Sequence, residues 1–178
     1  MGSPVKLYVY DLSGGLSKIL SKSLLGRQLE GIWHTAIVVF EKEYFFGSDG
    51  VKSCRAGGTI LQEPHEIIPL GETFVPYALF NEYLQGLKES RFAGSSYDLL
   101  KHNCNHFSDE LAQFLCGTRI PKHILNLPDI IRETPVGSTL LHLIEGLGRG
   151  PNITADRRNS REDSPEFLQL NSAIEEIR

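Results

Sequence analysis

An apolar run, GIWHTAIVVF at residues 31–40, most constrains how this chain can fold. The run falls well short of the roughly 18 apolar residues that a membrane-spanning helix needs. Both of its alternations are apolar, which is typical of a strand that is covered on both faces of a sheet. The run therefore predicts a central strand with other parts of the chain packed on its two sides.

The other segments predict strands early in the chain and helices later. VKLYVYD at 5–11 alternates apolar and polar residues, as a half-buried strand does, and YFFGSDG at 44–50 follows the central run closely enough to form a hairpin with it. Residues 47–73, rich in glycine and proline, predict loop with one short strand at 58–61. Helical periodicity appears at 15–26, at 73–90 and from about residue 104. Strands followed by helices indicate an α+β fold.

Composition excludes several classes of protein. A chain of 178 residues with net charge −4 and 40% hydrophobic residues predicts one ordinary globular domain. Mild acidity without a basic stripe argues against nucleic acid as a partner, and no apolar run is long enough for a membrane span. The three cysteines show no dense pairing pattern and no signal peptide is evident, which together predict a reducing, intracellular location.

The end of the chain differs in character from the rest. Residues 148–163 are polar, charged and rich in turn formers, which predicts a linker or a disordered segment. Ser164 and Pro165 then mark the start of a predicted helix. This helix could dock on the domain, bind a partner protein, or be a frayed tail. Its apolar residues are Phe167, Leu170, Ile174 and Ile177. The domain itself is expected at 4–147, with 148–178 as an appended segment.

The stretch KHNCNHFSDELAQFL, residues 101–115, places a cysteine where an amphipathic helix begins. Asn103 or Asn105 suits the N-cap, and apolar residues recur at helical spacing until Gly117 ends the helix. Cys104 therefore lies at a helix N-terminus, where unpaired N–H groups and the helix dipole favour an anion. Such a place can lower the pKa of a thiol and make the cysteine a nucleophile.

Two other interpretations of the cysteines stay open. A free cysteine is often a small buried hydrophobe, which suits Cys116 and can also apply to Cys104, whereas Cys54 lies in a glycine-rich segment without a local activator. Alternatively, His102, Cys104 and His106 stand at every second position and could offer three ligands to a zinc ion. No further ligands with paired spacing appear elsewhere in the sequence.

His34 is the candidate base for Cys104. It lies in the middle of the central run and shares its alternation with apolar residues, so it can be simply a core histidine. A rigid imidazole on a covered strand, facing a helix that packs across the sheet, is also how a base meets a thiol at a helix start. His102 and His106 are closer in sequence, but neighbours on one turn rarely point at the same spot.

In this order, PVKLYVYDLS, QLEGIWHTAIVVF, EYFFGSDG and HNCNHFSDELAQFL resemble the PPPDE family of permuted papain-like peptidases, and most closely its desumoylating isopeptidases. The resemblance spans about residues 4–145. It implies a permuted papain-like fold, with a small antiparallel sheet or barrel packed against helices. It also implies His34 as general base and Cys104 as nucleophile in a Cys-His dyad that needs no metal or other cofactor.

The resemblance further implies the partners of such an enzyme. These are target proteins that carry SUMO on lysine, and a second copy of the chain in a homodimer with the site in a groove between subunits. The expected location is cytoplasm and nucleus. The same dyad could instead cleave fatty thioesters from cysteine, as protein depalmitoylases do, and a non-catalytic adaptor for modified proteins or export factors is a third hypothesis.

The stretch N-C-x-H-F at 103–107 is also similar to the lecithin:retinol acyltransferase-like enzymes, which act on lipid esters. Those enzymes carry a second histidine about a dozen residues after the first, where this chain has FFGS. The third catalytic group of an acyltransferase is therefore missing here, and the isopeptidase hypothesis is favoured.

Overall fold

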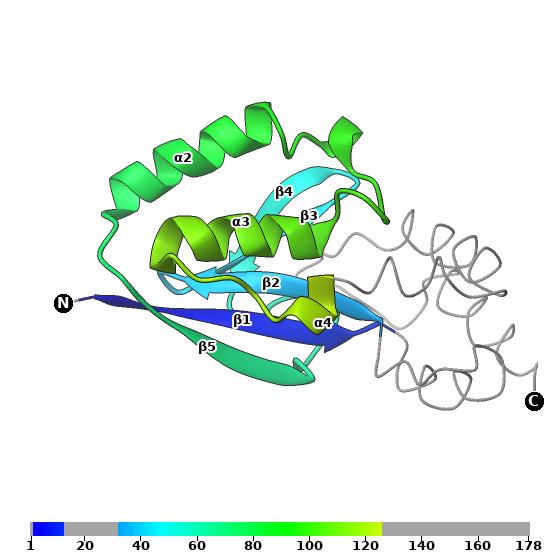
Figure 1. Cartoon of the computed structure of the whole chain (residues 1–178), viewed down its shortest axis with the longest axis horizontal. Helices are drawn as coiled ribbons and strands as arrows, with labels where there is room; N and C mark the ends of the chain where they lie inside the picture. Colours follow the sequence, from blue (N-terminus) through cyan, green and yellow to red (C-terminus); the bar gives the residue numbers. More distant parts are fainter. Residues whose placement is uncertain (1, 13–31, 126–178) are drawn as a thin grey trace, which may run out of the picture.

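A computed structural model describes residues 2–12 and 32–125, which form a five-stranded antiparallel sheet with helices on it (Figure 1). The strand order is β4-β3-β2-β1-β5, so β2 is central and β4 and β5 are the edges. The predicted α+β fold is confirmed. The strands are β1 (Ser3–Asp11), β2 (Trp33–Val39), β3 (Lys42–Gly47), β4 (Gly50–Arg55) and β5 (Glu66–Thr73).

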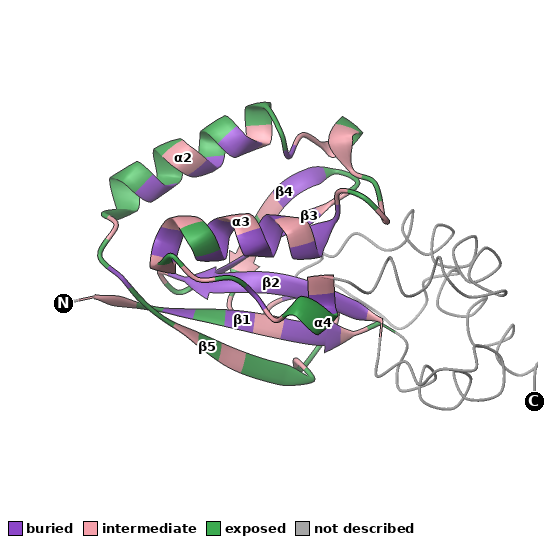
Figure 2. Cartoon of the chain, viewed as in Figure 1, coloured by how far each residue is buried: buried purple, intermediate pink, exposed green. Residues whose placement is uncertain are grey.

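The central strand β2 is buried at every residue, as the continuous apolar run predicted (Figure 2). β1, beside it, buries Val5, Leu7 and Val9, as its alternation predicted. The predicted hairpin from β2 to β3 is confirmed. Its two turn residues, Phe40 and Glu41, have φ of 50° and 63°, the left-handed conformation that a tight two-residue hairpin turn needs.

The loop predicted for residues 47–73 is wrong, because β4 and β5 lie there while residues 58–61 form no strand. Pro69 and Gly71 produced the error, since both residues are unfavourable inside a strand. The structure tolerates them because β5 is an edge strand and its pairing with β1 shifts register near this point. Cys54, expected in a loop, lies in β4.

Two helices, α2 (Tyr77–Glu89) and α3 (Cys104–Cys116), lie over the same face of the sheet (Figure 1). α2 begins later than the predicted residue 73, because Pro76 has an extended conformation and acts as N-cap. Both predicted ends of α3 are confirmed, with Gly117 at φ 64° as its C-cap. Short helical turns, η1 (Gly94–Ser96) and α4 (Lys122–Leu125), precede and follow α3.

The main hydrophobic core lies between the sheet and these two helices. Its fully buried residues include Leu7, Ile37, Phe46, Phe80, Phe107 and Leu111. On the opposite face of the sheet, Tyr10, Ala36 and Phe45 form a second, smaller cluster. Because side chains alternate along β2, residues of odd number there face the helices and those of even number face the smaller cluster.

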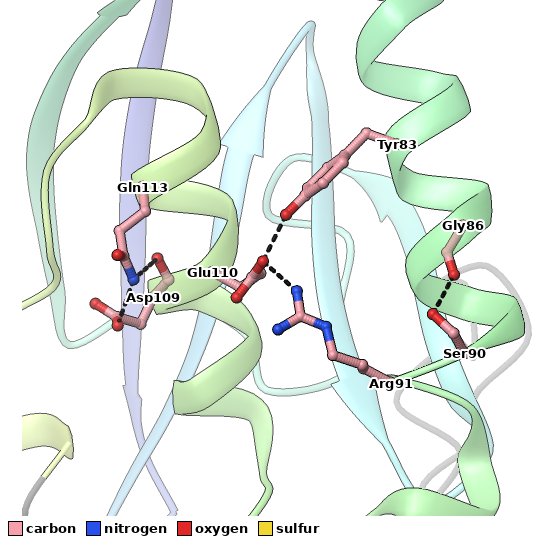
Figure 3. Close-up of polar contacts among 7 residues, drawn as sticks. All are labelled: Tyr83, Gly86, Ser90, Arg91, Asp109, Glu110 and Gln113. Atoms are coloured by element: carbon pink, nitrogen blue, oxygen red, sulfur yellow. Dashed lines mark hydrogen bonds and ion pairs between the residues drawn. The ribbon is translucent and has the colours of Figure 1, made fainter.

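A polar contact ties α2 to α3 on the outside of this core (Figure 3). The hydroxyl of Tyr83 donates to Glu110, and Arg91 forms an ion pair with the same carboxylate. The ring of Tyr83 also stacks on Phe114, with centroids 3.8 Å apart. Burial, and then Glu110, raise the pKa of Tyr83 to about 12, so the phenol remains a hydrogen-bond donor through the neutral range.

Several predictions fall on residues that the structure leaves undescribed. They are the helix at 15–26, the linker at 148–163, the C-terminal helix and the domain boundary at 147. Within the described ranges, none of the helices has the length and apolar character that a membrane crossing requires.

Candidate active site

The site begins with a split in the sheet. β2 pairs with β3 only from Val39 back to Ile37, while β3 continues to pair with β4 as far as Gly47. The edge of β2 from Trp33 to Ala36 therefore has no strand partner on the side of β3. Buried backbone groups need hydrogen bonds, so another part of the chain must provide hydrogen-bond partners for this edge. The first turn of α3 does so.

Asn103 fixes the start of α3. Its side-chain oxygen accepts hydrogen bonds from the N–H groups of Asn105, at 2.9 Å, and His106, at 3.4 Å. In return, Nδ1 of His106 accepts from the N–H of Asn103, which completes a capping box. Of the two predicted N-cap residues, Asn103 is the one the helix uses. The cap holds the helix start in place and so fixes where Cys104 lies.

Asn105 joins this turn to β2. Its side-chain nitrogen donates to the carbonyl oxygen of Trp33 at 3.3 Å and to that of Ile124 at 3.4 Å. Its side-chain oxygen accepts from the hydroxyl of Thr35 at 2.9 Å, and that hydroxyl is also 2.9 Å from Oγ of Ser108. Asn105, Thr35 and Ser108 are all buried. The amide of Asn105 therefore replaces the missing β3 partner of β2.

Cys104 lies at this junction, and its side chain is buried. Its sulfur is 3.6 Å from the side-chain oxygen of Asn105, to which the thiol donates. Burial raises the pKa of Cys104 to about 11, although hydrogen bonds from the N–H groups of Thr35, Asn105 and Cys104 itself act in the opposite direction. The predicted lowering of this pKa is wrong for the structure described, because the helix N-terminus is packed against β2 instead of facing water.

His34 is also buried, on the sheet face away from the helices. Its ring lies 6.1 Å from the rings of Tyr10 and Phe45, centroid to centroid. The prediction that it faces α3 is therefore wrong, since the alternation of β2 turns Thr35 toward α3 instead. Burial lowers the pKa of His34 to about 4. Among the described residues, its Nε2 atom has no hydrogen-bond partner.

Cys104 and His34 flank the same peptide unit of β2. The N–H of Thr35 faces the sulfur, and β1 occupies the other edge of β2, so the sulfur lies at the edge that β3 leaves. No hydrogen bond joins the thiol to the imidazole in the part of the chain described here. Catalytic hydrogen bonds often form only when substrate binds. A neutral imidazole can act as a general base for a neutral thiol once the two groups are in reach of each other.

The other candidate residues have structural roles. His102 stacks on Phe92 with ring centroids 4.5 Å apart, and its Nδ1 lies 3.1 Å from the carbonyl oxygen of Ser96. His106 serves the capping box, and Cys116 is half-buried at the end of α3, where burial raises its pKa. Across residues 2–12 and 32–125, no group of three or more His, Cys, Asp or Glu side chains is placed to hold a metal ion. The zinc interpretation therefore gains no support.

No sequence pattern indicates that Thr35 and Ser108 belong to the site, and the pattern around Asn105 indicates only a helix cap. The available signals were the position of Thr35 next to His34 and the second asparagine after Cys104. Neither signal says that these side chains meet, because the contact joins residues 70 positions apart in the chain.

Comparison with known proteins finds one matching family and several similar chains. Residues 3–145 match the family model of the PPPDE peptidase domain. The chain is 53% identical over 144 residues to "Desumoylating isopeptidase 1" of Homo sapiens, which covers 81% of this chain and 86% of that protein. It is 51% identical over 143 residues to the protein of that name from Xenopus laevis, covering 80% and 85%. "DeSI-like protein sdu1" of Schizosaccharomyces pombe is 31% identical over 141 residues, covering 75% and 67%.

Proposed function

Because the chain belongs to the PPPDE peptidase family, we propose that it is a cysteine isopeptidase that removes SUMO, a ubiquitin-like modifier, from lysine side chains of other proteins. The observation that carries this proposal is 53% identity over 144 residues with a protein named Desumoylating isopeptidase 1. The family match at 3–145 includes both Cys104 and His34. Their arrangement at the split of the sheet supports thiol chemistry at this place.

In the proposed reaction, the sulfur of Cys104 attacks the carbonyl carbon of the modifier's terminal glycine, where it is bonded to the lysine nitrogen. Nε2 of His34 accepts the thiol proton and then gives it to the leaving lysine amine as the C–N bond breaks. The product is a thioester between Cys104 and the modifier. Water, deprotonated by His34, hydrolyses this thioester and releases the modifier with a free carboxylate.

Burial of both groups supports a general-base mechanism over a resting ion pair. With a pKa of about 4, His34 is unprotonated at neutral pH and can accept a proton. With a pKa of about 11, the thiol of Cys104 is protonated and must lose its proton as it attacks. The N–H of Cys104 is a candidate donor for the oxyanion that forms on the glycine carbonyl, since it lies beside the attacking atom.

The proposal predicts that the chain releases SUMO from a lysine conjugate faster than it releases ubiquitin from the matching conjugate. The reason is that a folded modifier binds through surfaces remote from the scissile bond, and this binding accelerates the chemical step. A palmitoylated cysteine peptide, tested side by side, decides between isopeptidase and depalmitoylase. Both assays use Cys104→Ala as a blank. If the chain hydrolyses the palmitoyl thioester and releases no SUMO, the isopeptidase hypothesis is wrong and the depalmitoylase hypothesis takes its place.

We also propose that the chain acts as a homodimer in cytoplasm and nucleus. Apolar side chains that are exposed near the edge strand β5 and the start of α2 supply a surface on which a second copy can pack. They are Ile67, Phe74, Tyr77 and Leu79. Sedimentation velocity of the full chain is expected to show a dimer that Phe74→Asp dissociates, and a monomer at all concentrations would contradict it.

Microscopy of the tagged chain tests the proposed location in cytoplasm and nucleus. Exclusion of the chain from both compartments would refute it.

A further inference from the structure

We propose that Asn105 is the positioning residue of the dyad: its amide nitrogen ties the turn that carries Cys104 to the strand that carries His34, and its oxygen holds the thiol proton in the resting enzyme. This inference rests on the proposed function for its kinetic consequences. It rests on the hydrogen bonds of Asn105 for its structural part, which holds whatever the substrate is.

The side chain of Asn105 is fully used and its orientation is fixed. Both of its N–H bonds go to backbone carbonyl oxygens, of Trp33 and Ile124. Both acceptor positions of its oxygen are occupied, by the hydroxyl of Thr35 and the thiol of Cys104. A flipped amide would point its oxygen at two carbonyl oxygens, so only one orientation fits. A buried amide with four partners is a rigid connection between β2, α3 and α4.

The backbone and the side chain of Asn105 have opposite effects on the ionisation of Cys104. The N–H groups of Thr35, Asn105 and Cys104 favour the thiolate, whereas the side-chain oxygen of Asn105 accepts from the S–H bond and so favours the thiol. Ionisation must therefore break the bond to Asn105. In the proposed mechanism the proton goes to Nε2 of His34, which is buried and has no hydrogen-bond partner among the described residues. Rotation of the S–H bond from Asn105 toward His34 would change the resting site into the reactive one.

The phenol of Tyr97 is a titratable group that responds to Cys104. Burial, and then the charge of Cys104, raise the pKa of Tyr97. The variants below leave Tyr97 in place, and any change in thiol ionisation can be assigned to the residue replaced.

The test measures alkylation of Cys104 by iodoacetamide against pH, with Cys54 and Cys116 as references in the same sample, resolved by peptide mass spectrometry. In Asn105→Asp, a carboxylate beside the sulfur is expected to shift alkylation to higher pH and to lower kcat for SUMO release more than tenfold. Thr35→Val keeps the shape of the site but removes one donor to the Asn105 oxygen, which then holds the thiol proton more strongly. A smaller shift in the same direction is expected.

Gln113→Ala is the matched control, because this exposed residue lies on the same helix and bonds Asp109, away from the sulfur. Its alkylation profile and kcat are expected to stay within twofold of those of the unmodified chain. A merely structural role for Asn105 would loosen the site, and Cys104 would then react at lower pH in both Asn105→Asp and Thr35→Val. That result, or unchanged alkylation in both, overturns the proposal. If Asn105→Asp does not fold, Thr35→Val decides alone. Alkylation needs no substrate, so it remains informative even if SUMO is not released.

Discussion

Replacing Cys104 by alanine is expected to remove SUMO release almost completely while the chain remains folded. The loss follows from the mechanism, because no other thiol lies at the split between β2 and β3: Cys54 is in β4 and Cys116 is at the far end of α3. The change in stability is expected to be no more than about 1–2 kcal/mol, as for other small buried substitutions. Thr35 still donates to the Asn105 oxygen when the thiol is gone.

Initial rates on a SUMO-lysine conjugate and urea unfolding, measured on the same preparations, check this expectation. Cys116→Ala is the matched control, since it removes a thiol from the same helix and should leave the rate unchanged. Loss of folding in Cys104→Ala would return Cys104 to the role of a structural core residue. Full activity in a folded Cys104→Ala would exclude it as the nucleophile.

Replacing His34 by glutamine is expected to make the free energy of unfolding less sensitive to acid. The unfolded chain binds a proton on this residue near pH 6.5, whereas the folded chain binds it only near pH 4. As pH falls between these values, the unfolded state takes up a proton that the folded state does not, so stability is lost. The contribution is complete above about pH 6.5 and its loss amounts to roughly 3 kcal/mol below pH 4.

Urea unfolding of both proteins between pH 7 and pH 4 measures this difference. Glu43 acts in the opposite direction, because burial raises its pKa and stability from this group falls as pH rises, but its effect cancels in the comparison. His123→Gln, at an exposed position, is the control and should follow the unmodified chain. Parallel curves for His34→Gln and the unmodified chain would show that His34 is not held neutral by burial. SUMO release by His34→Gln should be lost at every pH.

Local patterns predicted the parts of the fold whose cause is local. The apolar run of β2, the alternation in β1 and the asparagine-to-glycine bounds of α3 each reflect a property of consecutive residues. β5 could not be predicted this way, since Pro69 and Gly71 oppose a strand and only its position at the sheet edge makes them acceptable. That segment is a strand because it pairs with β1, which lies far from it in the sequence.

The candidate site shows the same division. The residue types and the helix start make Cys104 a candidate nucleophile, and the resemblance to permuted papain-like peptidases makes His34 its candidate base, but the sequence could not give their surroundings. The face on which His34 lies depends on which side of β2 the helices cover, and the raised pKa of Cys104 depends on the packing of α3 where β2 separates from β3. The network of Asn105, Thr35 and Ser108 exists only because of this packing.

The central claim is that Cys104 attacks the carbonyl carbon of a SUMO C-terminus. SUMO with a vinyl sulfone in place of its terminal carboxylate reacts covalently with a thiol at that position, so it reports attack directly. The account predicts a one-to-one adduct, mapped to Cys104 by mass spectrometry, that forms faster than the matching ubiquitin adduct and is absent in Cys104→Ala. An adduct on Cys54 or Cys116, or no adduct with SUMO while the palmitoyl thioester is hydrolysed, would contradict it.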